Sequence, residues 1–238
     1  MTSIKFMKSP RRHQCKYICP RLPIGLFGKA TVLAAAIGLS GCSEQGERTA
    51  TAESWQRIDN QGRVVDDQDG LHRCVFDQRT DLLWEVKQTE DGAHRFDATY
   101  SWYNEDPTQH MSEPGLLNGG DCDLERCDTS ALVVAVNQTG LCGQRDWRIP
   151  QREELLTLGD YQLIESGIVL DPEFFPHALP AEYWTASTFR LYPQSAWVVS
   201  AANGLDRGER KSEARPARLV RGDIFNPRKP PDASVATE

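Results

Sequence analysis

The sequence predicts an α+β domain built from short antiparallel strands, two central helices and disulfide cross-links. Strand-like patterns occupy the beginning and the end of the folded region, whereas helical patterns lie in its middle. Four cysteines follow the first 42 residues, an even number that suits two disulfides. Aromatic residues make up 8% of the 238-residue chain, which is typical of a domain with its own core.

The clearest local pattern is a strand-to-helix corner at residues 142–155. Trp147 alternates with Asp146 and Arg148, as in a half-buried strand. Pro150 ends that strand and has the fixed φ that suits a first helical turn, and leucines follow at helical spacing. We interpret these four residues as scaffold. A direct role in binding for Arg145, Asp146 or Arg148 is the alternative.

Further elements are predicted on either side of this corner. Residues 72–76 and 82–86 are apolar runs separated by a polar stretch, which predicts a hairpin. Asp128 offers a helix cap and Gly140 a helix end, with apolar residues at helical spacing between them. Three later strands are predicted at residues 182–187, 195–200 and 215–221, and the last of them could pair with the first hairpin.

The N-terminal residues resemble a bacterial lipoprotein signal. Basic residues precede a short apolar run at 30–40, which leads into Leu-Ser-Gly-Cys at 39–42. The resemblance implies that residues 1–41 are a signal peptide and that Cys42 carries acyl chains, which anchor a protein stably in a membrane. Ser43 in the next position indicates the outer membrane.

Composition divides the rest of the chain into three parts. Residues 42–70 are polar and charged, so they are interpreted as a tether that begins at the lipidated cysteine. Residues 71–222 hold the strand, helix and cysteine patterns and are predicted to form one domain. Residues 223–238 contain three prolines and are expected to be a disordered tail.

The four later cysteines, Cys74, Cys122, Cys127 and Cys142, allow three disulfide connectivities. Cys122 and Cys127 lie close together in one loop, whereas Cys74 lies in the first strand and Cys142 at the corner. We therefore predict the pairs Cys122–Cys127 and Cys74–Cys142. Such bonds belong to an oxidising compartment.

Acidic residues surround the first of these pairs, among them Asp121 and Asp123. Calcium accepts such oxygen ligands, but the chain lacks the loop pattern of calcium-binding hands. Zinc binding by two cysteines has no histidine nearby to complete it. We predict no metal and no other cofactor, and we interpret this stretch as a solvated acidic loop, with calcium as the alternative.

Charge restricts the classes of partner. The chain has a formal charge of −7, but residues 1–42 contain seven basic residues and no acid, so the remainder is near −14. This charge disfavours nucleic acid as a partner. A basic cluster near the C-terminus, which includes Arg215 and Arg218, is the exception. It is a candidate ligand surface, although charges that protect a strand edge explain it more simply.

The order of motifs over residues 72–222 resembles the Lcl C-terminal domain family. The matching motifs are Thr-Asp-Leu-Leu-Trp-Glu at 80–85, Tyr-Ser-Trp-Tyr at 100–103, Ala-Val-Asn at 135–137, Leu-Cys-Gly at 141–143, Asp-Trp-Arg-Ile-Pro at 146–150, Arg-Glu-Glu-Leu at 152–155, Tyr-Trp-Thr at 183–185, Ala-Trp-Val-Val at 196–199 and Arg-Leu-Val-Arg at 218–221. The resemblance implies an envelope or extracellular domain related in fold to C-type-lectin-like domains. In the namesake of the family, the domain is an adhesin module that binds sulfated polysaccharides.

These inferences lead to the hypothesis of a lipid-anchored, non-catalytic binding or adhesion domain of the cell envelope. We expect its long loop at 88–128 to bind a carbohydrate or another surface ligand. The candidate ligand-binding residues are Tyr100, Trp102, Tyr103, Asp121, Asp123, Arg215 and Arg218. The alternative is a structural or assembly lipoprotein that binds an envelope protein. Known catalytic motifs are absent from the sequence, so no enzyme is expected.

Overall fold

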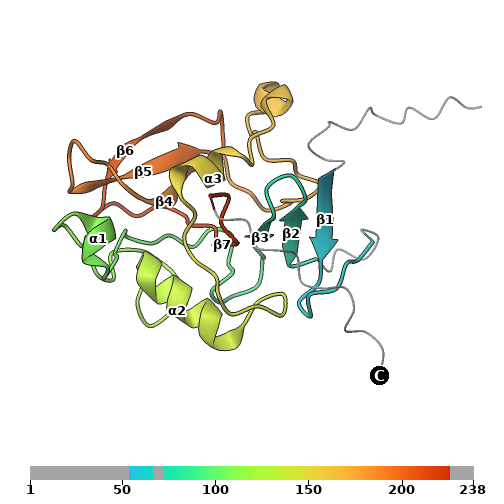
Figure 1. Ribbon diagram of the computed structural model, residues 1–238, viewed down its shortest axis with the longest axis horizontal. Helices are drawn as coiled ribbons and strands as arrows, with labels where there is room; N and C mark the ends of the chain where they lie inside the picture. Colours follow the sequence, from blue (N-terminus) through green and yellow to red (C-terminus); the bar gives the residue numbers. More distant parts are fainter. Residues whose placement is uncertain (1–53, 67–71, 226–238) are drawn as a thin grey trace, which may run out of the picture. The chain divides into compact units, whose positions relative to one another are not determined.

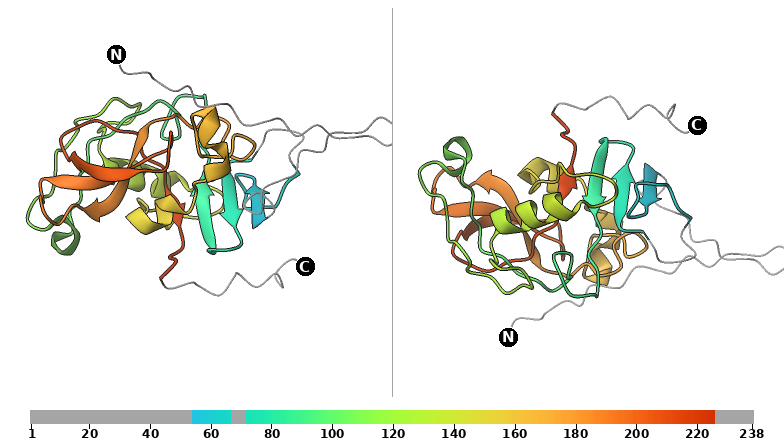
Figure 2. Two further views of the ribbon diagram at one scale, coloured as in Figure 1. Left: turned by 90° about the horizontal axis from the view of Figure 1, so that it is seen from above. Right: turned by 90° about the horizontal axis from the view of Figure 1, so that it is seen from below.

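Two antiparallel sheets and three α-helices make up the part of the chain that this computed structural model describes, residues 54–66 and 72–225. The arrangement confirms the predicted α+β class (Figure 1). In both views of Figure 2, helices α2 (Thr129–Thr139) and α3 (Arg152–Leu156) appear in the middle of the domain, with one sheet toward each side. The predicted signal peptide, the lipidation site Cys42 and the tail beyond residue 225 lie outside the described residues.

The first sheet contains β1 (Trp55–Ile58), β2 (Cys74–Asp77), β3 (Leu82–Glu85) and β7 (Val220–Arg221), in the order β1-β2-β3-β7. Strands β2 and β3 form the predicted hairpin, in which Asp77 lies opposite Leu82. The Asp77 carboxylate accepts a hydrogen bond from the backbone N–H of Arg79, which holds the turn. Strand β7 pairs with β3, as expected for the last strand, but it has two residues and does not extend over 215–221.

Strand β1 corrects the interpretation of residues 42–70 as a tether. It pairs antiparallel with β2, and its Trp55 is buried with its ring edge-on to Phe174 and Phe175, at centroid distances of 5.1 and 5.3 Å. Polar neighbours concealed this strand, because its apolar residues are too few to make a pattern by themselves. The folded domain therefore begins before residue 71.

The second sheet contains β4 (Glu182–Thr188), β5 (Ser195–Ser200) and β6 (Asp206–Arg210), in that order. The predicted strands at 182–187 and 195–200 are confirmed. Strand β6 was not predicted, because its sequence Asp-Arg-Gly-Glu-Arg contains no apolar residue. It forms as an edge strand by pairing along β5, after a turn in which Gly204 has a φ of 72°.

Helix α2 (Thr129–Thr139) confirms the predicted central helix at both ends. The Asp128 carboxylate accepts from the backbone N–H of Ala131, and Gly140 ends the helix with a φ of 82°. Helix α1 (Pro107–His110) is a single turn inside the long loop, and it was not predicted. Its cap is Asp106, whose side chain accepts from the backbone N–H of Thr108.

The strand-to-helix corner lies where the sequence predicts it, but its strand and the start of its helix differ from the prediction. Arg148 forms an isolated bridge with Val220, so the expected strand reduces to one pairing. Helix α3 (Arg152–Leu156) begins two residues after Pro150, which therefore precedes the first turn and does not belong to it. The Glu154 carboxylate accepts from the backbone N–H of Gln151 at 2.8 Å, so an acidic side chain satisfies a donor at the helix start.

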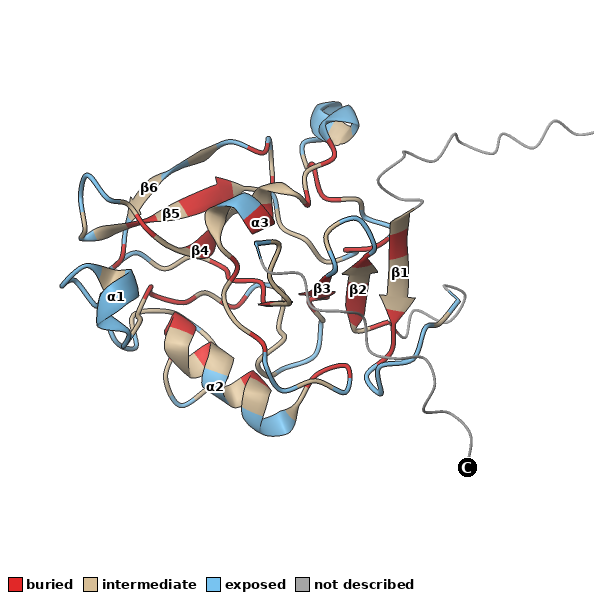
Figure 3. Cartoon of the chain, in the orientation of Figure 1, coloured by how far each residue is buried: buried red, intermediate tan, exposed pale blue. Residues whose placement is uncertain are grey.

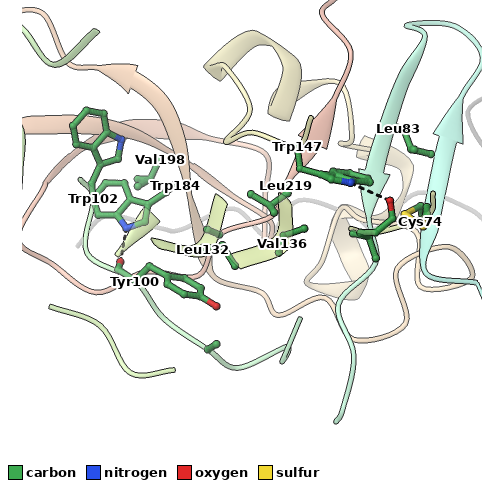
Figure 4. Close-up of a cluster of buried hydrophobic side chains, with 14 of the residues drawn as sticks. Cys74, Leu83, Tyr100, Trp102, Leu132, Val136, Trp147, Trp184, Val198 and Leu219 are labelled. Atoms are coloured by element: carbon green, nitrogen blue, oxygen red, sulfur yellow. Dashed lines mark hydrogen bonds between the residues drawn. A yellow bond between two sulfur atoms is a disulfide. The ribbon is translucent and has the colours of Figure 1, made fainter. Parts of the chain in front are cut away.

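Two clusters of buried side chains form the core, and Figure 3 shows the burial of the chain around them. One cluster contains Trp84 and the two phenylalanines that contact β1. The other contains Trp102, Trp147 and Trp184 together with the apolar face of α2 (Figure 4). The Trp147 indole donates to Leu141 O at 3.1 Å, so the corner tryptophan is anchored in the core as predicted.

Both predicted disulfides are confirmed. Cys74 in β2 bonds to Cys142 at the corner, with their Cα atoms 6.4 Å apart. Cys122 bonds to Cys127 within the long loop, with their Cα atoms 5.6 Å apart. Within residues 54–66 and 72–225, no helix is long and apolar enough to cross a membrane.

Candidate functional site

Two of the expected ligand-binding aromatics are core residues. Tyr100 and Trp102 are 0% and 1% exposed. The Trp102 indole donates to Thr185 O at 2.8 Å, and Tyr100 O accepts from the Trp184 indole at 2.7 Å. A ring that is closed to solvent cannot stack on a sugar, so neither ring offers the stacking surface that was expected. They hold the long loop against β4.

The basic cluster is also not a free cationic surface. Arg218 is 1% exposed, and its guanidinium carbon lies 4.7 Å from the ring centroid of Phe175. Arg215 pairs with Glu209 at 2.6 Å and with Glu182 at 3.4 Å. The prediction of a ligand role for Arg218 is therefore wrong, and Arg215 is neutralised by neighbouring carboxylates.

The acidic residues Asp121 and Asp123 interact mainly with other residues of the long loop at 88–128. Asp123 accepts from Gly92 N–H at 2.9 Å and pairs with Arg95 at 2.5 Å. The backbone of Asp121 pairs with Thr99, while its side chain is exposed. The described residues contain no group of three or more His, Cys, Asp or Glu that could hold a metal ion. The arrangement offers calcium no assembled set of ligands.

A groove with a volume of about 240 Å³ opens where the long loop, α2, the corner and β4 meet. Its polar lining consists of Tyr103, Asn104, Gln109, Thr129, Ser130, Arg148 and Gln151. Its apolar lining consists of Trp102, Val133, Val134, Ile149 and Ala186. The groove thus combines apolar surface with uncharged donors and acceptors, which suits a small polar ligand.

Of the predicted aromatics, Trp102 and Tyr103 line this groove, and Tyr103 is the one that is partly exposed. Thr129 fixes its backbone, because the Thr129 hydroxyl accepts from Tyr103 N–H at 2.9 Å and donates to Tyr103 O at 2.8 Å. Among the described residues, the hydroxyls of Tyr103 and Ser130 have no hydrogen-bond partner. Both hydroxyls are therefore available to a ligand.

Arg148 contributes the only charge in the lining, and that charge is already paired. Its guanidinium donates to both carboxylate oxygens of Glu154, at 2.6 Å each, and also to Gly222 O. Glu154 is buried and binds the start of α3 as well. Arg148 therefore connects the corner to the C-terminal strand, and the groove is electrically neutral.

Lys211 fixes the wall of the groove that α1 forms. Its ammonium lies 3.9 Å from the ring centroid of Trp102 and donates to His110 O at 3.2 Å and to Glu113 O at 2.6 Å. Burial lowers the pKa of Lys211 to about 8, although the charge of Glu113 acts in the opposite direction. Lys211 thus ties the end of α1 to the core.

A buried charge network fixes the start of the long loop. Glu85 is fully buried, and its carboxylate contacts Lys87 at 2.9 Å and His94 at 2.8 Å. It also accepts from Leu219 N–H at 2.8 Å. Burial opposes the ionisation of Glu85, but the charge of Lys87 and the hydrogen bonds lower its pKa to about 2. The network therefore joins the loop to β3 and the C-terminal segment.

The family model for the Lcl C-terminal domain matches residues 73–221, which include both disulfides and the groove. The chain belongs to the Lcl C-terminal domain family. A search of curated proteins found no match. The two disulfides of this Lcl C-terminal domain indicate an extracellular or periplasmic location.

Most groove residues of the Lcl C-terminal domain were missed because they come from four separate segments. Ser130, Gln109 and Gln151 are ordinary polar residues without a motif, and only the packing of their segments brings them together. One feature of the sequence did indicate a groove residue. Tyr103 ends the aromatic motif of 100–103, and alternation along an extended chain places it on a different side from Trp102.

Proposed function

We propose that this Lcl C-terminal domain binds an uncharged carbohydrate in the groove lined by Tyr103, Ser130 and Gln151. The neutral lining supports the proposal most directly, because it combines the free hydroxyls of Tyr103 and Ser130 with apolar side chains. A sugar presents hydroxyls along its edge and C–H groups on its face, and such a groove satisfies both. The two walls are held by Lys211 and by the Arg148–Glu154 pair, so the groove is preorganised.

An uncharged sugar fits better than a sulfated polysaccharide, the ligand of the family's namesake. Sulfate groups require unpaired cations, but Arg148 and Arg215 are both paired with carboxylates. This proposal therefore assigns the same general role, carbohydrate binding, to a different chemical class of ligand.

The proposal places the domain on the envelope as a non-catalytic lipoprotein, anchored through Cys42 in the outer membrane. Support comes from the lipobox-like sequence before that cysteine and from the disulfides, which need an oxidising compartment. A relation to C-type-lectin-like domains belongs to the same proposal and is supported by family membership. Replacing Cys42 with Ser should leave uncleaved precursor, whereas normal processing of that variant would refute the anchor.

A glycan array with the full chain tests the carbohydrate proposal. We expect binding to neutral glycans that persists at high salt and in the presence of a chelator, since neither ion pairs nor calcium contribute. Tyr103→Ala should reduce affinity at least about tenfold, through loss of the stacked ring. Tyr103→Phe should weaken binding less, because only the hydroxyl is removed.

Tyr161→Ala is the matched control, since Tyr161 is exposed and lies outside the groove. It should bind as the unmodified protein does. Salt-sensitive binding to sulfated glycans that Tyr103→Ala leaves unchanged would contradict the proposal.

A second candidate function is the assembly of envelope proteins through an apolar patch. Tyr161, Ile164 and Leu205 are exposed, and the Tyr161 ring packs against Gly204, which joins the 3-10 helix Tyr161–Ser166 to the turn before β6. Exposed apolar residues on adjoining segments are typical of protein interfaces. Cross-linking in cells at Leu205, compared with Val64, would reveal a partner specific to this patch.

A further inference from the structure

The loop between β4 and β5 exposes a leucine and a tyrosine at one end of the second sheet. Leu191 is 78% exposed and Tyr192 is 59% exposed. The loop is well ordered by its own contacts, because Tyr192 N–H donates to Phe189 O at 3.0 Å and Ser195 N–H donates to Tyr192 O at 2.8 Å. Figure 3 shows this exposed loop beyond the ends of β4 and β5. Presenting these side chains therefore requires no further ordering of the loop.

Packing explains the rigidity of this loop. The rings of Phe189 and Tyr192 stack with centroids 5.9 Å apart, and Phe189 meets Trp197 edge-on at 4.7 Å. Phe189 also lies over Gly208 of β6, where an added Cβ would approach the ring to 3.0 Å. Because Gly208 has no side chain, it leaves room for the Phe189 ring, which packs beside the loop that carries Leu191.

Two arginines flank the exposed apolar residues without a partner. Arg190 precedes Leu191, and Arg210 lies on β6 opposite Ser195. Strand alternation places Arg210 on the same face of β6 as Gly208, which is the face that Phe189 covers. Neither guanidinium has a hydrogen-bond or ion-pair partner among the described residues.

These two residues differ from the other arginines of residues 54–66 and 72–225. Arg218 is buried, Arg145 donates to Asn137 O at 3.2 Å at the end of α2, and the rest pair with carboxylates. The paired residues are Arg57, Arg63, Arg73, Arg79, Arg95, Arg126, Arg148, Arg152, Arg207, Arg215 and Arg221. Three arginines of the described residues are therefore neither buried nor paired with a carboxylate: Arg190 and Arg210 flank Leu191, and Arg145 lies at the end of α2.

A surface hollow adjoins the loop, and Glu113, Lys211 and Ser212 belong to its lining. Leu116 is exposed and lines this hollow together with Gln194 and Arg210. The Glu209 carboxylate accepts from the backbone N–H of Arg210 at 2.9 Å, and Glu113 lines the same hollow, but among the described residues neither forms an ion pair with the guanidinium of Arg190 or Arg210. Glu113 acts instead on the buried Lys211.

We propose that the β4–β5 loop is a membrane-contacting tip that inserts Leu191 and Tyr192 into the interface of an anionic lipid bilayer. Arg190 and Arg210 would pair with lipid phosphates while the apolar side chains enter the boundary between headgroups and acyl chains. An amphipathic tyrosine is suited to this depth, where one end of the ring is apolar and the other wet. The tip uses different residues from the groove, so it does not depend on the proposed carbohydrate.

Hydrogen–deuterium exchange of the full chain tests this proposal locally. The chain is mixed with vesicles of phosphatidylcholine alone or of phosphatidylcholine with phosphatidylglycerol. We expect the backbone amides of residues 189–195 to be protected only by the anionic vesicles. The turn around Leu205, which is 68% exposed, should exchange equally with both.

Substitutions separate the electrostatic from the apolar contribution. The double variant Arg190→Gln, Arg210→Gln should bind anionic vesicles about 25-fold more weakly, at about fivefold for each arginine, and should lose protection accordingly. Leu191→Ser should weaken this binding about tenfold or more. Arg145→Gln and Leu205→Ser are the matched controls and should change nothing at 189–195.

Three results would overturn the proposal. One is the absence of protection at 189–195 with anionic vesicles. Another is equal protection by neutral vesicles, which would remove the role of the arginines. The third is protection that requires an added envelope protein fraction and is not produced by lipid, which would make the tip a protein-binding surface.

Discussion

Glu85 shows how one buried side chain joins distant parts of this domain. Its carboxylate contacts Lys87 and His94, and its backbone carbonyl accepts from Arg218. A buried charge that loses its partner is strongly destabilising, because the remaining charge cannot be solvated. The stability of the domain should therefore depend on the ionisation of Glu85.

Glu85→Gln should lower the free energy of unfolding at neutral pH by about 3–5 kcal/mol, because it leaves Lys87 buried and unpaired. The folded-state pKa near 2 lies below the ordinary value of 4.5, so the carboxylate stabilises the fold above pH 4.5 and loses this effect as the pH falls toward 2. Denaturant unfolding at several pH values should show the difference between the proteins shrinking over this range.

Glu90→Gln provides the control for this prediction. Glu90 is exposed and lies 3.6 Å from Arg73, so its replacement should cost less than about 1 kcal/mol. A difference between Glu85→Gln and the unmodified protein that stays constant from pH 7 to pH 3 would show that the charge of Glu85 has little effect.

Helix α2 depends on a single capping side chain. Asp128 is fully buried and accepts from Ala131 N–H at 2.9 Å and from Asn118 N–H at 3.3 Å. Asp128→Ala should therefore destabilise the domain by about 1–2 kcal/mol, and Asp128→Asn should retain most of the stability. Thermal unfolding of both variants measures this, and equal losses would indicate that the negative charge is needed as well as the hydrogen-bond acceptor.

Strand β1 makes residues before the matched family region part of the fold. Trp55 is buried against Phe174 and Phe175, far from it in sequence. Trp55→Ala should lower the free energy of unfolding by about 3–5 kcal/mol. Val64→Ala, at an exposed position of the same segment, should have little effect in the same denaturant titration. Equal effects of the two substitutions would show that β1 does not stabilise the domain.

The two disulfides constrain the molecule on different scales. Cys74–Cys142 closes a loop of 68 residues, whereas Cys122–Cys127 closes one of 5 residues. Chain entropy predicts losses of about 4 and about 2 kcal/mol when the respective pairs are replaced by alanine. Comparing the melting temperatures of the two double variants tests this order. The reverse order would mean that the short bond also supports native contacts of the loop.

The local elements could largely be predicted because they depend on neighbours in the chain. The β2–β3 hairpin, helix α2 with Asp128 and Gly140, and strands β4 and β5 each have a pattern contained within their own residues. Strands β1 and β6 have no such pattern, since they form by pairing with strands already in place. The candidate groove is harder still to predict, because its lining comes from separate segments.

The sequence by itself determined the α+β class and the family, because motif order is a property of the chain, and it predicted the two disulfide pairs that the structure confirms. Only the tertiary structure decided which side chains meet solvent. It buried Tyr100, Trp102 and Arg218 and exposed Tyr103 and Leu191, since burial depends on which distant segments cover a residue. The groove and the tip therefore became visible only when the chain was folded.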